Sequence, residues 1–110
     1  MKYDVSILKL SEMEGKELIP GAKGRFVHSE NTTLAYWQFE AGTLLPEHSH
    51  PHEQITLIKQ GTFDLTVEDE TFHLEAGTVA VIPPEAHHSG TSITKCQIID
   101  VFYPVREDFR

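Results

Sequence analysis

The stretch GTLLPEHSHPHEQITLIKQG, residues 42–61, contains three of the chain's seven histidines. On an extended strand, residues two apart point to the same face, so His48 and His50 can direct their imidazoles at one point. Gln54 shares their parity if the strand resumes after Pro51. Neutral imidazole nitrogen is a common ligand of first-row metal ions. A His-x-His pair also occurs by chance on exposed turns, so a metal site and a solvated turn both stay open here.

A second block, GTVAVIPPEAHHSG, residues 77–90, contains two further histidines. A third imidazole arriving from another strand would complete a metal site that keeps positions open for water or substrate. By strand alternation, only one of two adjacent histidines can point to that site, and we expect His87 to point away. The two blocks together therefore favour the metal site.

The spacing of both blocks resembles the two conserved motifs of the cupin superfamily. The first block has Gly, five residues, His-x-His, three residues, Gln, six residues and Gly, and the second has Gly, five residues and Pro-x-Glu-x-x-His over 77–88. Gln54 stands where the family usually has Glu, and Glu85 where it usually has Gly. The resemblance implies an all-β double-stranded β-barrel, or jelly roll, with one divalent ion (Zn, Ni, Fe or Mn) held by His48, His50, Gln54 and His88.

Gln54 changes the expected charge of this site. Glutamine in place of glutamate removes one negative charge, so a bound ion would be a stronger Lewis acid toward oxygen atoms of a substrate. The remaining histidines are not expected to be ligands. His52 follows the turn at Pro51 and is assigned an outer supporting role or a loop role, whereas His28 and His73 are interpreted as surface residues.

The rest of the chain predicts one β-rich domain over residues 1–110. The hydrophobic fraction is 39% and the charged fraction 24%, as in ordinary globular domains, and no repeat or linker interrupts the chain. The only helical candidate, 11–18, is interrupted by Gly15 and is expected to be peripheral. Period-two alternation predicts strands at 33–40, 54–59, 79–82 and 94–103, and a hairpin that joins 63–67 to 72–74.

Net charge and cysteine content limit which partners and which cellular compartment are expected. The net charge of −8 would repel nucleic acid and anionic membranes alike, so neither is an expected partner. Cys96 is the only cysteine and excludes an intrachain disulfide, and no signal peptide is recognisable, which favours the cytoplasm. Small cupins commonly pair through their sheet edges, so the resemblance also implies a homodimer.

The segment 94–103 is apolar on both faces, which predicts a central or covered strand. Asp100 shares a face with Ile98 and Phe102, and a buried carboxylate is costly unless it is paired or does chemistry. One interpretation is therefore a buried ion pair of Asp100 with Arg106 or Arg25.

A functional interpretation comes from the tail DVFYPVREDF, residues 100–109. Together with HSHPHEQ at 48–54, it resembles one branch of small cupins, the pectin-degradation cupins, which convert 4,5-unsaturated monouronates into linear keto sugars. The resemblance implies that Asp100, Phe102 and Arg106 are active-site residues beyond the metal. Asp100 would act as general acid and base, Arg106 would bind the carboxylate of a small anionic sugar, and Phe102 would form an apolar wall.

Two other functions stay open on the sequence. Cupins that hold iron through three histidines include dioxygenases, and an anaerobic assay would separate such an enzyme from a ring-opening enzyme. The chain could also be a non-enzymatic module that senses a metal or a small ligand. In that case, replacing Asp100 with Asn would leave ligand binding and every measured activity intact. The metal, the exact uronate and the oligomeric state are left open by the residues alone.

Overall fold

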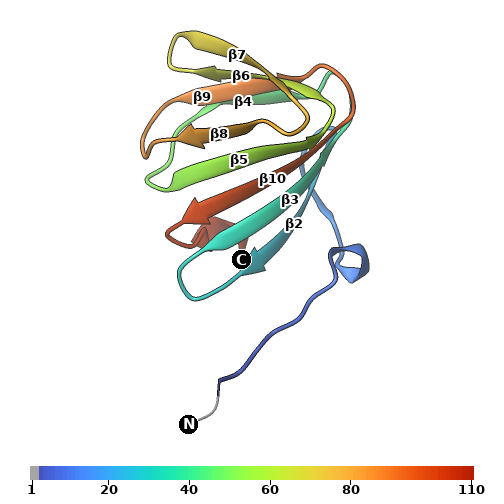
Figure 1. The fold of residues 1–110 in the computed structure, drawn as a ribbon, viewed down its shortest axis with the longest axis vertical. Coiled ribbons are helices and arrows are strands. Elements are labelled where there is room, and N and C mark those ends of the chain that lie inside the picture. The colour runs from blue at the N-terminus through green and yellow to red at the C-terminus, as the bar shows by residue number, and fades with distance from the viewer. Residues whose placement is uncertain (1–2) are drawn as a thin grey trace.

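The computed structural model describes residues 3–110, which fold into two packed antiparallel sheets with an N-terminal segment that extends away from them (Figure 1). The order of strands is β1-β2-β3-β10-β5-β8 in the larger sheet and β4-β9-β6-β7 in the smaller one. In chain order the elements are η1 (Leu10–Glu12), β1 (Lys16–Ile19), β2 (Ala22–His28), β3 (Thr33–Phe39), β4 (Leu44–His48), β5 (Glu53–Gln60), β6 (Thr62–Val67), β7 (Glu70–Glu75), β8 (Val79–Ile82), β9 (His88–Ser92), β10 (Cys96–Tyr103) and η2 (Glu107–Phe109).

The core lies between the two sheets and is built from alternating residues of their strands. Phe39 and Ile58 come from the larger sheet, and Phe63 and Leu65 come from the smaller one. Burying apolar side chains in this way is the main favourable contribution to folding. The alternation predicted for these segments is therefore confirmed as one buried and one outer face.

Strand β10 is central, as its two apolar faces predict. It pairs with β3 on one side and with β5 on the other. Its residues alternate in burial, so that Ile98, Asp100 and Phe102 point into the molecule. This arrangement carries the carboxyl group of Asp100 to the inner face of the larger sheet.

The helix predicted over 11–18 is wrong. Leu10–Glu12 form a single 3₁₀ turn, and Lys16–Ile19 form β1, which pairs with β2. Pairing with β2 supplies backbone hydrogen bonds that outweigh the weak helical tendency of a segment interrupted by Gly15. No helix within residues 3–110 is long and apolar enough to cross a membrane.

Gly61 ends the first histidine block and shows why a glycine is required there. Its φ of +91° lies in the left-handed region, which residues with a Cβ rarely adopt. A Cβ at this position would also collide with the backbone oxygen of Lys95. The tight link between β5 and β6 therefore depends on glycine, and with it the path of β5 toward the site.

Candidate metal centre and adjoining cavity

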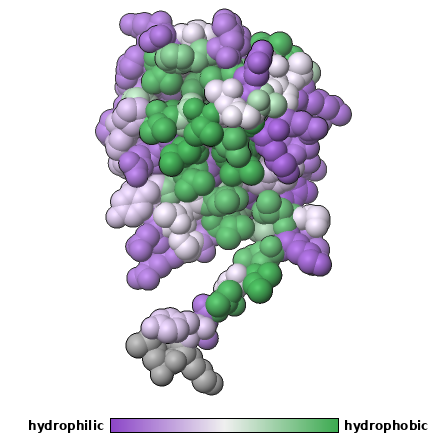
Figure 2. Space-filling model, viewed as in Figure 1, coloured by the Kyte–Doolittle hydropathy of each residue, from purple (hydrophilic) through white to green (hydrophobic). Residues whose placement is uncertain are grey.

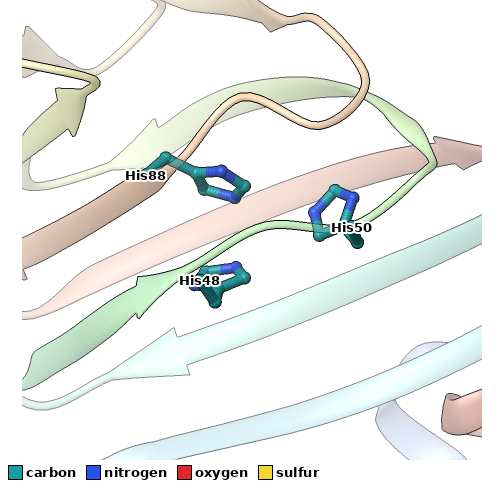
Figure 3. A group of neighbouring side chains, drawn as sticks. All are labelled: His48, His50 and His88. Carbon is teal, nitrogen blue, oxygen red and sulfur yellow. The ribbon is translucent and has the colours of Figure 1, made fainter.

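Three histidines meet at one end of the space between the sheets (Figure 3). His48 is the last residue of β4, His50 lies in the link to β5, and His88 is the first residue of β9. His48 and His88 are paired in register across β4 and β9, and one ring nitrogen from each of the three histidines lies within 4.8 Å of the others. The structure thus brings together the three imidazoles that the sequence assigns to a metal.

Backbone carbonyl groups hold all three rings in one tautomer. Each Nδ1 lies within hydrogen-bonding distance of a carbonyl oxygen two residues away in the chain. Such a bond places the proton on Nδ1 and leaves the lone pair of Nε2 free to bind a metal ion. For His48, His50 and His88, the acceptors are the carbonyl oxygens of Pro46, His52 and Ala86, at 2.9, 3.0 and 2.9 Å.

The contacts of Nε2 test whether these residues fit a cation. The Nε2 atom of His88 is buried and has no hydrogen-bond partner within the described residues. The Nε2 atom of His50 lies 3.1 Å from Oε1 of Gln54, and in this tautomer both atoms are acceptors. Two acceptors this close repel each other unless a cation satisfies their lone pairs. The His48, His50 and His88 cluster therefore could hold a metal ion, and the oxygen of Gln54 faces the same point.

Neighbouring side chains fix the orientation of Gln54. Its amide nitrogen donates to Oγ1 of Thr56 at 2.9 Å, and the Thr56 hydroxyl donates to Oδ1 of Asp100 at 2.6 Å. Because the carboxylate of Asp100 takes the hydroxyl proton, the Thr56 oxygen accepts from the amide, and the amide oxygen must point to the histidines. A three-residue hydrogen-bond chain thus joins the candidate metal centre to Asp100.

Burial keeps two of the histidines neutral near neutral pH. The pKa of His50 is lowered to about 4, mainly by desolvation and in addition by the positive charges of Arg106 and His88. Desolvation is also the main reason that the pKa of His88 is lowered. Neutral imidazole is the form that binds metal ions, so protons compete weakly for this site above mildly acidic pH.

A cavity of about 290 Å³ adjoins the histidines, and most of the residues predicted for the site line it. Of the residues that the sequence assigns to the site, His48, Gln54, Asp100, Phe102 and Arg106 line this cavity. Trp37 and Phe109 add aromatic walls that sequence reasoning missed. Residues far apart in the chain therefore share one pocket, in which polar groups converge between apolar walls.

Asp100 is the buried acid of this cavity, with only 8% of its surface exposed. Burial raises the pKa of its carboxyl group to about 6, although polar contacts with Thr56, Gln54 and Trp37 oppose this rise. The expected ion pair is not found, because within residues 3–110 neither Arg106 nor Arg25 forms a salt bridge with Asp100. Asp100 is thus a carboxyl group that can gain or lose a proton near neutral pH.

Arg106 lies between two aromatic rings at the other wall of the cavity. Its guanidinium carbon is 4.7 Å from the ring centre of Phe102 and 4.1 Å from that of Phe109. Two of its nitrogens donate to the carboxylate of Asp108, at 2.9 and 2.7 Å, and its backbone nitrogen donates to Thr33. This fork uses Nε and Nη2, so the Nη1 edge of the guanidinium is left for an anion in the cavity.

The remaining histidines behave differently from the three that cluster. His87 is exposed, as alternation along the strand predicts. His52 supports the site through its backbone oxygen, which accepts from His50, and its own ring lies 5.4 Å from that of His50. His73 pairs with Asp64 on the surface, and His28 contacts Thr33.

Sequence reasoning missed Thr56 and Asp108, the two polar residues that hold the acid and the arginine. Thr56 carried a signal, because it lies two residues after Gln54 and so shares its face of the strand. No sequence pattern pointed to Asp108, because strand alternation does not apply in the 3₁₀ turn of Glu107–Phe109.

Comparisons with known proteins agree with this geometry. The family model described as the Cupin domain matches residues 35–102. The pectin degradation protein KdgF of Dickeya dadantii (strain 3937) is 28% identical over 101 residues, which cover 89% of this chain and 92% of that protein.

Two solved structures resemble this chain over almost its whole length. KdgF from Halomonas sp. has a TM-score of 0.90 at 26% identity, covering 96% of this chain and 100% of that one. An RmlC-like cupin from Shewanella frigidimarina NCIMB 400 has a TM-score of 0.91 at 25% identity, covering 100% of both chains. The jelly-roll fold expected from the histidine blocks is therefore confirmed. This chain belongs to the cupin family and is a KdgF-like member of it.

Proposed function

We propose that this chain acts as a single cupin domain and as a metal-dependent enzyme that converts 4,5-unsaturated uronates into linear keto sugars. The observation that carries the proposal is the position of Asp100. It is a buried carboxyl group with a pKa near 6, in one cavity with the candidate metal ligands and Arg106. Similarity to the pectin degradation protein KdgF supports a substrate from pectin breakdown.

The metal would be held by His48, His50 and His88, with Gln54 as a fourth ligand. When bound, a divalent ion supplies Lewis acidity that polarises oxygen atoms near it. The neutral amide of Gln54 leaves the charge of such an ion undiminished. The three carbonyl acceptors behind the imidazoles hold the rings in place, so this end of the cavity is organised before a ligand arrives.

The reaction is an isomerisation in which one carboxyl group can act first as the base and then as the acid. The proton of the C1 hydroxyl leaves, the bond from C1 to the ring oxygen breaks, and an aldehyde at C1 and an enolate at C5 are formed. A proton added at C4 then converts the enolate to a ketone, so no atom is gained or lost overall. Asp100 accepts the first proton and donates the second, because its pKa of about 6 makes both forms accessible near neutral pH.

Arg106 and Phe102 position the substrate. Arg106 lines the cavity, and the guanidinium edge that does not bond to Asp108 suits the carboxylate of a uronate, which carries two oxygens in one plane. Phe102 is 3% exposed and lies with its ring centre 5.6 Å from that of His50, so it excludes water between the metal end and the arginine. This wall favours a compact ring over an extended oligosaccharide.

The deciding experiment incubates metal-loaded protein with monomeric unsaturated galacturonate or mannuronate. We expect faster loss of the absorbance of the conjugated double bond, and NMR should show the open-chain ketone. The rate should be the same without oxygen, because the isomerisation consumes none. Asp100→Asn should lower kcat by about 10²- to 10⁴-fold at unchanged metal content, and Asp69→Asn, in an exposed turn, is the control. Loss of absorbance no faster than in buffer would refute the proposal.

A further inference from the structure

Arg106 reaches the cavity from a tail that lies outside the two sheets. It follows β10 and directly precedes η2. Figure 2 shows the outer face of the larger sheet, with apolar side chains gathered over it. The tail lies against the opposite, inner face, where Phe109 of η2 stacks on Phe26 of β2 with 4.6 Å between ring centres. This stack holds the end of the tail, and Arg106 has a contact of its own with the sheet.

A buried threonine of β3 makes that contact. The backbone nitrogen of Arg106 donates to Oγ1 of Thr33 at 2.9 Å. Thr33 is 0% exposed and Arg106 is 8% exposed, so water has little access to replace this bond. Thr33 also lies opposite Phe102 in the pairing of β3 with β10, and the ring of Phe102 covers the guanidinium at 4.7 Å. The Thr33 hydroxyl therefore fixes the backbone from which the guanidinium extends.

A histidine of β2 holds the threonine hydroxyl in turn. Nδ1 of His28 lies 2.8 Å from Oγ1 of Thr33, and the two residues are opposite each other in the pairing of β2 with β3. Within the described residues, the Thr33 hydroxyl has no partner besides His28 and Arg106. Because its oxygen accepts from Arg106, its proton is donated to Nδ1, and the imidazole carries its own proton on Nε2. His28 is thus bonded inward and half-buried.

The turn between β2 and β3 places this pair. The backbone nitrogen of Ser29 donates to the carbonyl oxygen of Thr32 at 2.9 Å, and the hydroxyl oxygens of the two residues lie 2.7 Å apart. This closed turn brings the flanking residues, His28 and Thr33, face to face across the hairpin. The backbone position of Arg106 therefore depends on a short hairpin 73 residues earlier in the chain.

We propose that Thr33, with His28 behind it, positions Arg106 for the anionic group of the substrate, so that the preference of the cavity for a carboxylate depends on the hairpin of β2 and β3. The inference rests on the proposed function, in which Arg106 binds the carboxylate of a uronate. Neither Thr33 nor His28 lines the cavity, so both are positioning residues that do not touch the substrate. Asp108 and the aromatic rings orient the guanidinium, and Thr33 fixes its origin.

Loss of the Thr33 hydroxyl would leave the backbone nitrogen of Arg106 buried without an acceptor, and the tail would have to move to satisfy it. A guanidinium displaced with the tail binds a planar carboxylate less well, because two hydrogen bonds in one plane depend on its orientation. A neutral sugar does not use this contact. The three histidines lie on or beside β4 and β9, away from the hairpin. The expected signature is therefore a loss of anion preference with metal binding intact.

The first test compares a charged and a neutral sugar. Trp37 is the only tryptophan of the chain and lines the cavity, so its fluorescence reports binding there. The probes are galacturonate, which lacks the double bond and is not converted, and galactose, which lacks the carboxylate. With Zn²⁺-loaded protein, we expect galacturonate to bind more tightly than galactose. Thr33→Val should lower this preference about tenfold at unchanged galactose affinity, and Thr33→Ser should retain it.

His28 gives an independent pair of variants. His28→Phe keeps a ring but removes the acceptor of the Thr33 proton, and it should lower the preference for galacturonate roughly threefold. His28→Asn places an amide oxygen near the position of Nδ1 and should retain the preference. Equal loss in His28→Phe and His28→Asn would contradict the role of Nδ1. If Thr33→Val no longer binds Zn²⁺ and is therefore misfolded, the His28 pair decides the outcome.

The matched control is Thr43→Val. Thr43 is also a buried threonine, 6% exposed, and its hydroxyl donates to the carbonyl oxygen of Glu40 at 2.7 Å. It lies beyond the other end of β3, so its loss should cost stability without changing sugar preference. An equal loss of preference in Thr43→Val and Thr33→Val would show a general loss of stability and overturn the proposal.

The second test observes the contact directly, by NMR hydrogen exchange at the backbone amide of Arg106. We expect slow exchange in the unaltered chain and in Thr33→Ser, and exchange at least about tenfold faster in Thr33→Val. Exchange or sugar preference unchanged in Thr33→Val, or no preference for galacturonate in the unaltered chain, would overturn the proposal. A chain that prefers galacturonate but converts no unsaturated uronate refutes the proposed function alone.

Discussion

The two ends of the cavity are built in different ways. At the histidine end, each imidazole is held by a carbonyl group two residues away in the chain. At the acid end, the partner of Asp100 comes from a distant part of the chain, since Thr56 lies 44 residues away. Locally held groups appear in the sequence as a spaced motif, whereas groups held by distant partners appear only as isolated residues. The difference explains why the metal end is the easier one to recognise.

The largest expected effect is at the histidine end. His88→Ala removes a buried ligand whose Nε2 has no partner within the described residues. We expect the affinity for Zn²⁺ or Ni²⁺ to fall more than about 100-fold, beyond the 10- to 100-fold typical for losing an outer partner. Competition with a chelating dye measures this. The matched control, His87→Ala, should bind as the unaltered chain does, and an equal loss in both variants would contradict the assignment.

A second test addresses the acid end through stability. Because the pKa of Asp100 is raised from 3.8 to about 6 by burial, the folded state binds more protons than the unfolded state between these values. Raising the pH therefore destabilises the fold, by at most about 3 kcal/mol for a shift of about two units. Asp100→Asn lacks this cost, so its free energy of unfolding relative to the unaltered chain should increase between about pH 4 and pH 7.

Denaturant unfolding in the presence of EDTA measures this difference without a contribution from bound metal. Asp69→Asn, in the exposed turn between β6 and β7, serves as the control. A constant difference between Asp100→Asn and the unaltered chain across this pH range would show that the Asp100 carboxyl is not perturbed by burial.

The third test asks whether the two ends are independent. Thr56→Val removes the hydroxyl that orients Gln54 and bonds to Asp100. Freed from this contact, the amide of Gln54 can turn its nitrogen toward the histidines, and we expect metal affinity to fall about tenfold. Thr56→Ser keeps the hydroxyl and should restore the affinity. Unaltered metal binding in Thr56→Val would mean that the hydrogen-bond chain has no influence on the metal end.

The smallest expected effect concerns Asp108, the partner of Arg106. Hydrogen bonding from Arg106 holds the pKa of the Asp108 carboxyl below its usual range, so the pair persists in mild acid. Asp108 is largely exposed, which limits the pair to about 1 kcal/mol or less. Asp108→Asn should therefore raise KM for an unsaturated uronate up to about fivefold at similar kcat. Glu107→Gln is the neighbouring control, and a fall in kcat alone would argue against a positioning role.

Segments rich in β-branched or aromatic residues were predicted as strands, whereas β4 and β9 were not. Segment 94–103 became β10, because its inward and outward residues differ plainly in their surroundings. β4 contains Pro46, and β9 is short and made of small or polar residues. Pairing with neighbouring strands makes them strands, because β9 lies between β4 and β6 and pairs with both. Tertiary pairing, rather than local propensity, also decided β1, where a helix was predicted.

The residues of the candidate site also differ in how far the sequence could predict them. The three histidines could be predicted to converge, because parity and motif spacing express their geometry directly. Asp100 could be predicted to be unusual, since an acid on an apolar face is conspicuous. The partner of Asp100 could not be predicted, because the sequence does not distinguish an ion pair with an arginine from a hydrogen bond with a threonine. In the structure, the partner is Thr56.

The last turn of the chain, η2, has a practical consequence for anyone preparing this protein. Phe109 stacks on Phe26 and covers one face of Arg106, yet the turn that carries it contributes no residue to the core between the sheets. Trimming by a protease at this point would remove the Phe109 wall of the cavity without removing any residue of the core between the sheets. Intact mass is therefore the quality check that shows whether a preparation retains the whole cavity.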